Sequence, residues 1–170
     1  KVAFGLKPEE KIPSDPLTWA QKQVETLPEL NWKGKYILSE KELRKHWTKL
    51  RVEENTTLRK KFKNDPKGFK IAEKQLENET GEKFWSSNEI CIRHAEGVRS
   101  HNPVHAKLWY FWTNHFTISD TQRLGKFVTG AYQREFIRAN MDKKFETMAS
   151  EATMAWPMIM HLDNKDNIGP

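Results

Sequence analysis

Apolar residues recur three and four positions apart along most of this sequence, and no segment alternates convincingly between apolar and polar residues. The first spacing is that of one face of an α-helix, whereas alternation is typical of a β-strand. The pattern therefore predicts an all-α fold. With 170 residues, 36% of them hydrophobic and 11% aromatic, the chain can bury a core, so we expect a compact multi-helix domain.

Capping side chains and prolines divide this pattern into helices. Asp15 before Pro16 predicts one helix start, with the helix running to Pro28. Ser39 and Glu42 have the spacing of a capping box and predict a second start. The other expected elements are a helix from 58, a turn at 65–68 with a short helix after it, a helix capped by 86–88, a helix at 103–116, and a helix from 127 that continues through 152 until it breaks at 156–157.

The two halves of the chain differ in charge. Residues 1–85 carry 19 basic and 14 acidic side chains, whereas residues 86–170 carry 10 and 9, so most of the net charge of +6 lies in the first half. We expect a charged helical segment at 1–85 and an apolar helical core segment at 86–170 within one domain. The single cysteine, Cys91, has no partner for an internal disulfide.

The helix at 103–116 contains the most apolar stretch of the chain and is expected to be central and nearly fully buried, with Trp112 in the core. His115 lies seven residues after Leu108 and so falls within the same apolar stripe. A buried imidazole needs a partner. In a structural core histidine the partner is a carbonyl or a carboxylate. The alternatives are that His115 binds a metal or a haem iron, or that it acts as an acid–base group.

Glu135 lies four residues after Ala131 on the inward face of a later helix, and Arg138 is one turn further on. A carboxylate there must be paired, and Arg138, the adjacent Arg134 or His115 across the core could each pair with it. The structural interpretation is a buried ion pair that fixes helix packing. The functional one is a pocket in which Glu135 orients the imidazole of His115. His115, Glu135 and Arg138 are therefore the candidate catalytic residues, and His115 is the candidate metal ligand.

Three other groups are weaker candidates for a metal or nucleic-acid site. They are the histidines His94, His101 and His105; His161 with Asp163 and Asp166; and the basic cluster at 59–63. A proline breaks the helical register between the three histidines, so we expect solvated loop and helix-end side chains. The second group lacks the glycine and the terminal glutamate of a calcium loop, and a capped helix end explains it equally well. Acidic residues flank the basic cluster, which favours a solvated helix face, so no nucleic-acid partner is expected; a nucleic-acid-binding module that uses residues 59–63 is a third and weaker interpretation.

The segment LWYFWTNHFTIS at 108–119 resembles the FW-x-NHF-x-x-S signature of the bacterial domain of unknown function 1800 family, and the resemblance continues from Gly130 to Pro170. It implies bacterial origin, export to the periplasm or the extracellular space, and frequent gene pairing with a sulfatase-like family numbered 1501. It implies no accepted activity. Members of the family continue well beyond this point, so we expect the chain to be the front portion of a larger helical protein. We expect residues 164–170 either to be held by something outside the chain or to be poorly packed.

Two interpretations of function follow. The leading one is an exported helical module of unknown activity that acts as an envelope or extracellular assembly or binding component. Its expected partners are the remainder of the same protein or other envelope proteins, including a sulfatase-like protein. The alternative is a metal- or haem-dependent oxidoreductase or hydrolase whose site is completed by a missing C-terminal part, with His115, Glu135 and Arg138 as the contribution of this chain.

Motifs that name a reaction or a cofactor are absent from the sequence: it has no glycine-rich phosphate loop, HExxH, paired CxxC or nucleophile elbow. The cofactor, and whether the chain is an enzyme, therefore stay open. The longest strongly apolar stretch without charge, Leu108 to His115, is much shorter than the roughly 20 residues of a membrane-spanning helix, so no transmembrane segment is expected.

Overall fold

The computed structural model describes residues 11, 13–30, 32, 37–49, 55–79, 81–119, 123–164 and 167. These residues form helices and no strand, so the predicted all-α fold is confirmed. The helices are α1 (Pro16–Lys22), α2 (Glu40–Thr48), α3 (Asn55–Lys61), α4 (Pro66–Glu79), α5 (Glu82–Arg99), α6 (Pro103–His115), α7 (Arg123–Tyr132), the π-helix η3 (Gln133–Ile137), the 3-10 helix η4 (Arg138–Asn140), α8 (Phe145–Met154) and α9 (Trp156–His161).

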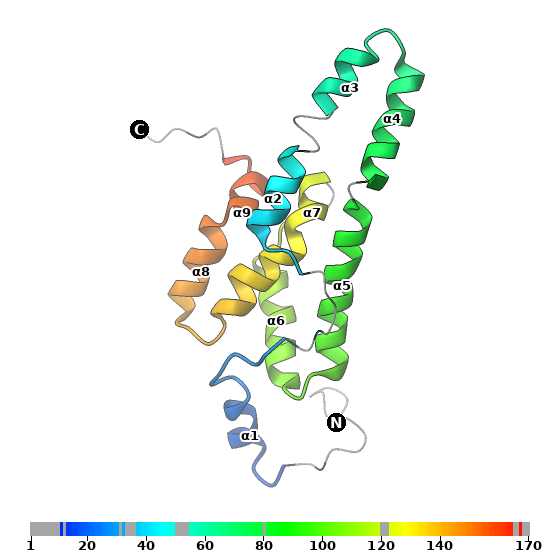
Figure 1. The fold of residues 1–170 in the computed structure, drawn as a ribbon. Coiled ribbons are helices and arrows are strands. Elements are labelled where there is room, and N and C mark those ends of the chain that lie inside the picture. Colours follow the sequence, from blue (N-terminus) through cyan, green and yellow to red (C-terminus); the bar gives the residue numbers. More distant parts are fainter. Residues whose placement is uncertain are drawn as a thin grey trace.

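α5 and α6 run side by side in opposite directions, and α7 lies at the centre of the helix packing (Figure 1). α7 packs against α5 and α2, and α8 and α9 lie beyond it. The hairpin of α3 and α4 projects from one end of the molecule, and α1 lies at the other. α5 continues across the predicted segment boundary at residue 85, and α2 from the first segment shares a core with α7 from the second.

Local capping signals place the starts of the first two helices as predicted. The carboxylate of Asp15 accepts hydrogen bonds from the backbone N–H groups of Leu17 (3.1 Å) and Thr18 (3.2 Å). At α2, the Ser39 hydroxyl accepts from the Glu42 N–H (3.2 Å), and the Glu42 carboxylate accepts from the Ser39 N–H (2.8 Å). This reciprocal pair is the predicted capping box.

Two predicted helix ends are wrong. α1 stops at Lys22 instead of reaching Pro28, and the next residue, Gln23, turns inward and accepts a hydrogen bond from the N–H of Val104 at the start of α6 (3.1 Å). α5 starts at Glu82 and not after the polar residues 86–88. Gly81 adopts φ +67°, a left-handed conformation that favours glycine and allows the chain to turn into the helix before these residues.

The predicted turn at 65–68 and the predicted continuity from 127 to 152 also need correction. Residues 66–68 form the first turn of α4, where the Asp65 carboxylate accepts from the Gly68 N–H (2.9 Å). The chain leaves the helix after Asn140 and enters α8 at Phe145. The apolar spacing persists across this break because both helices face one core.

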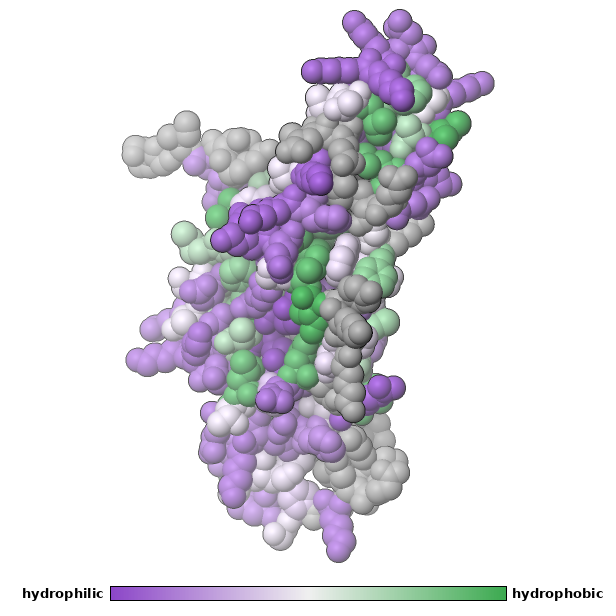
Figure 2. Space-filling model, viewed as in Figure 1, coloured by the Kyte–Doolittle hydropathy of each residue, from purple (hydrophilic) through white to green (hydrophobic). Residues whose placement is uncertain are grey.

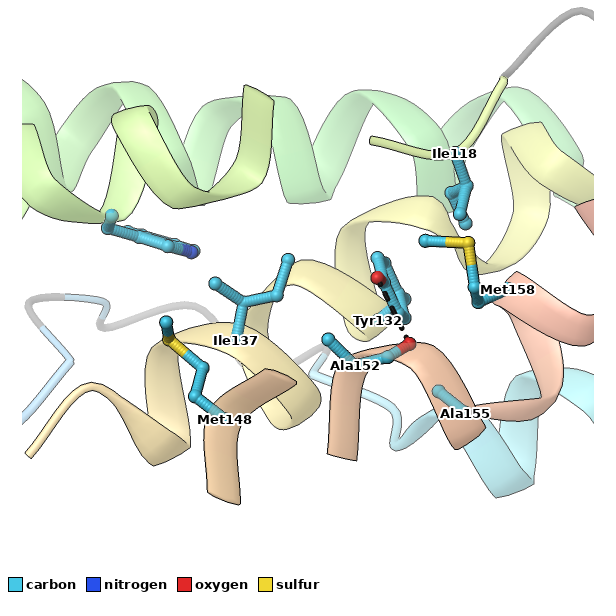
Figure 3. Packing of buried hydrophobic residues seen from close by; sticks show 8 residues of the cluster. Ile118, Tyr132, Ile137, Met148, Ala152, Ala155 and Met158 are labelled. Carbon is cyan, nitrogen blue, oxygen red and sulfur yellow. Dashed lines mark hydrogen bonds between the residues drawn. The ribbon is translucent and has the colours of Figure 1, made fainter. Parts of the chain in front are cut away.

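That core joins α6, α7, η3, α8 and α9 (Figure 3). Its buried members are Trp109, Ile118, Tyr132, Ile137, Met148, Ala152, Ala155 and Met158. The hydroxyl of Tyr132 hydrogen-bonds to the backbone oxygens of Phe116 (3.1 Å) and Ala152 (3.3 Å), and burial raises the pKa of this phenol. A second cluster, Leu43 with Phe127, Val128 and Ala131, fixes α2 on α7.

The surface is mostly polar. Figure 2 shows hydrophilic side chains over most of one face and at the tip of the α3–α4 hairpin. The basic side chains of the 59–63 cluster are exposed, as expected of a solvated helix face. Within the described part of the chain, no helix is long and apolar enough to span a membrane. Of residues 164–170, which we expect to be held by something outside the chain or to be poorly packed, the structure describes only Asn164 and Asn167. Both are exposed.

Candidate functional site

One face of α5 forms polar pairs with the irregular helix that follows α7. The three α5 residues lie at positions i, i+4 and i+7, and the pairs are Glu89 with Arg134 (3.0 Å), Arg93 with Gln133 (2.9 Å) and Glu96 with Arg138 (3.6 Å). We call these six residues the polar ladder; they run along the contact between α5 and the irregular helix that follows α7. The partners on the second helix belong to the π-helical turn and the 3-10 turn after it, and π-turns are frequent at functional sites.

Gly130 allows α5 and α7 to approach closely at one end of the ladder. A Cβ atom at this position would overlap the side chain of Glu89, so only glycine fits without moving the helices apart. This contact places Glu89 next to the start of the π-helix, where Arg134 reaches it.

A polar cavity of about 340 Å³ opens beside the ladder, between α5, the C-terminal end of α6 and α7. It is lined by Ser86, Glu89, Ile90, Arg93, Asn114, Thr117, Ile118, Ser119, Thr129, Gly130 and Gln133. The cavity falls within the roughly 300–1,000 Å³ of small-molecule sites. Three of its walls are thus built by the ladder, by α7 and by the 114–119 segment. We call it the polar pocket.

A second polar group is fully buried at the other end of the ladder. Arg138 donates to the backbone oxygen of Pro28 (2.6 Å), pairs with Glu96 and lies over the ring of Trp109 (5.6 Å). His105 is 2% exposed, and neither ring nitrogen forms a hydrogen bond within the described residues. Burial, with a contribution from the charge of Arg138, lowers the pKa of His105 to about 4, so this histidine is neutral near pH 7.

The predicted burial of His115 is wrong. The inward face of α6 consists of His105, Ala106, Trp109 and Thr113, and it is turned by roughly 100°, one residue step, from the predicted stripe. His115 is exposed on the other side, where its ring contacts other aromatic rings. The helix is apolar on nearly all sides, so hydrophobicity did not decide which face is inward. The inward face is the one that carries Trp109, whose ring lies in the core and whose indole N–H donates to the backbone oxygen of Gln133 (3.0 Å).

The rings around His115 form a continuous exposed surface. It comprises Phe111, Trp112 and His115 of α6, Phe116 directly after this helix, and Phe145 of α8. The ring centroids lie between 4.9 and 6.4 Å from their neighbours. Phe111 and Phe145 are 56% and 54% exposed. Trp112, predicted to be in the core, is only half-buried here. We call this group the aromatic surface.

Glu135 does not meet His115. Its carboxylate accepts from the backbone N–H of Glu40 at the first turn of α2 (3.0 Å) and from Arg134 (3.1 Å). Arg134 also donates to the backbone oxygen of Leu38 (2.6 Å), so both side chains fix the start of α2. Burial raises the pKa of Glu40, and the charge of Glu135 adds to this shift.

The structure therefore brings none of the three predicted site residues together. Of the partners considered for Glu135, the adjacent Arg134 is the one observed, and Arg138 pairs with Glu96 instead. Glu89, Arg93 and Glu96 were not identified from the sequence as partners of the later helix. Their helical spacing was a signal, because it places them on one face of a helix, as Arg134 and Arg138, one turn apart, lie on one face of another.

The weaker groups are resolved in part. His94 and His101 are exposed, as expected, but the expectation of solvation is wrong for His105. His161 accepts a hydrogen bond through Nδ1 from the N–H of Ser119 (3.2 Å), Asp163 is exposed, and Asp166 lies outside the described residues. Among the described side chains, no three His, Cys, Asp or Glu residues are grouped so that they could hold a metal ion.

Comparison with known proteins identifies the family of the chain. Residues 1–170 match the family described as "Protein of unknown function (DUF1800)". Searches of the curated proteins and of the solved structures found no match. The match covers the entire sequence, including the segments that form the ladder, the polar pocket and the aromatic surface. The chain belongs to the DUF1800 family.

Proposed function

We propose that this chain is an assembly module of an exported bacterial protein and that a partner protein binds to its aromatic surface. The observation that carries the proposal is the contiguity of five rings across α6 and α8, two of them more than half exposed. Aromatic side chains are enriched at the centres of protein interfaces, and exposed apolar patches of this kind mark interaction sites.

The family resemblance supports the same surface. Four of its five rings, Phe111, Trp112, His115 and Phe116, belong to the FW-x-NHF segment that carries the resemblance. Trp112 and Phe116 are partly buried and pack against the core around Trp109, whereas Phe111 and His115 remain exposed. A role in binding a partner accounts for aromatic residues at exposed positions.

The partner and the location also come from the resemblance. The family's frequent gene pairing with a sulfatase-like family makes that protein the partner we propose, in the periplasm or outside the cell. The remainder of a longer polypeptide is the other source of a covering segment, and it would compete for the same rings.

The test is a binding measurement between this chain and the sulfatase-like product of the neighbouring gene, by isothermal titration calorimetry. The double variant Phe111→Ser, Phe145→Ser removes the two most exposed rings and is expected to weaken the complex at least tenfold. Phe84→Ser is the matched control, because Phe84 is 47% exposed on α5 and outside the aromatic surface. Equal affinity for the double variant and the unaltered chain would refute the surface; no complex with the unaltered chain would refute the partner.

The alternative of a metal- or haem-dependent oxidoreductase or hydrolase stays a prediction. The geometry supports it less than assembly, because His115 and Glu135 lie apart, with separate partners.

A further inference from the structure

The polar pocket contains hydrogen-bonding side chains that have no partner among the residues that the structure describes. Ser86, Asn114 and Thr117 line the cavity, and their side chains form no hydrogen bond to the described part of the chain. Ser86 comes from α5, whereas Asn114 and Thr117 come from the end of α6 and the segment after it. The groups therefore converge on the cavity from two sides and could bind a ligand that carries several hydroxyl groups.

The pocket also has a positive charge that no described carboxylate compensates. The guanidinium of Arg93 donates to the neutral amide oxygen of Gln133 (2.9 Å) and lies over the ring of Tyr110 (5.6 Å), but it pairs with no carboxylate among the described residues. Its Nε is buried without a hydrogen-bond partner there. The other charged lining residue, Glu89, is already paired with Arg134 (3.0 Å). An anionic ligand group would balance Arg93.

We propose that the polar pocket binds a small carboxylate that also carries hydroxyl groups, the chemistry of an acidic sugar. Arg93 pairs with the carboxylate, since a guanidinium matches its planar geometry. The unused side chains of Ser86, Asn114 and Thr117 bind the hydroxyl groups. Ile90, which is 46% exposed, supplies an apolar wall for the C–H face of a ring. This site is separate from the aromatic surface, so it does not depend on the proposed protein partner.

The first experiment titrates the purified chain with D-glucuronate, D-glucose and acetate and follows the backbone amide signals by NMR. We expect glucuronate to shift the signals of the pocket residues and to bind at least tenfold more tightly than glucose or acetate, because only glucuronate carries both features. Glucose binding equal to that of glucuronate would refute the role of the charge. Acetate binding equal to that of glucuronate would refute the role of the hydroxyl groups, and no binding of glucuronate at millimolar concentration would refute the site.

Variants of matched chemistry locate the binding. Arg93→Gln is expected to weaken glucuronate binding roughly tenfold or more, whereas Arg99→Gln, exposed in the last turn of the same helix and outside the pocket, leaves it unchanged. Ser86→Asp adds a like charge to the lining and is expected to abolish binding, and Ser87→Asp, on the exposed neighbour, leaves most of it. Circular dichroism checks that each variant folds. If Arg93→Gln does not fold, the serine pair still decides the matter, and equal binding by both serine variants overturns the proposal.

Discussion

His105 is a buried histidine without a hydrogen-bond partner for either ring nitrogen in the described structure, and Arg138 carries a positive charge close to it. A protonated imidazole in this place would be desolvated and repelled by the guanidinium, which is why the pKa of His105 falls to about 4. In the unfolded chain the same group has a pKa of about 6.5. His105 therefore links folding to pH.

We predict that stability falls as pH is lowered from about 6.5 to about 4. In this window the unfolded state binds a proton at His105 and the folded state does not, so acid favours unfolding. The loss due to this group is on the order of 3 kcal/mol. Urea unfolding at several pH values measures it. His105→Gln should flatten the dependence in this range, whereas a variant of the exposed His101, His101→Gln, should retain it; an unchanged pH dependence in His105→Gln contradicts the prediction.

Trp109 is the aromatic anchor of α6. It is 2% exposed, its indole N–H donates to the backbone oxygen of Gln133 (3.0 Å), and its ring lies beneath Arg138. We predict that Trp109→Ala lowers the free energy of unfolding by about 3–5 kcal/mol. Trp112→Ala should cost clearly less, because Trp112 is half-buried on the aromatic surface. Chemical denaturation of both variants checks the order, and a larger loss for Trp112→Ala would contradict it.

Helix ends in this fold are capped both locally and from a distance. α2 begins with its own capping box, and Glu135 adds a carboxylate to the N–H of Glu40 from 95 residues away. Carboxylates at a helix N-terminus satisfy free N–H groups and interact favourably with the helix dipole. The start of α2, which lies in the charged first half of the chain, is thus held against the second half by Glu135.

We predict that Ser39→Ala destabilises the protein by about 1 kcal/mol, because the N–H of Glu42 loses its acceptor. Ser14→Ala is the control: Ser14 is exposed and lies outside the helices. Thermal unfolding of both variants measures the difference. An effect as large for Ser14→Ala would mean that the capping box contributes nothing specific.

The molecule is unevenly stabilised along its length. One buried apolar cluster joins α6, α7, η3, α8 and α9 and the other joins α2 and α7, whereas the α3–α4 hairpin projects away from them (Figure 1). The hairpin has one buried apolar side chain, Leu76, among its described residues. Segments with few buried apolar contacts open most easily.

Amide hydrogen exchange is therefore expected to be faster in α3 and α4 than in α7 and α8. The measurement is mass spectrometry of peptides after timed exchange at neutral pH. Slower exchange in 55–79 than in 145–154 would contradict the distribution of stability that the packing indicates.

Local chemistry in the sequence was sufficient for the fold class, for the capping box at Ser39 and Glu42 and for the bounds of α6. These features depend on residues within one or two helical turns of one another. Which face of a helix lies inward was not predictable in the same way. α6 is apolar almost all around, so either His105 or His115 could have been the inward histidine.

Tertiary packing chose between these faces. Trp109 packs against core side chains of α7, η3 and α8, so its face of α6 lies inward with His105, and His115 is left among exposed rings. Packing also joins Glu135 to α2, Gln23 to the start of α6 over 81 residues, and three residues of α5 to the π-helical turn and the 3-10 turn after it. Contacts of this kind form between segments far apart in the chain. Their partners are set by which helices lie side by side, and a periodic pattern within one helix does not contain that information.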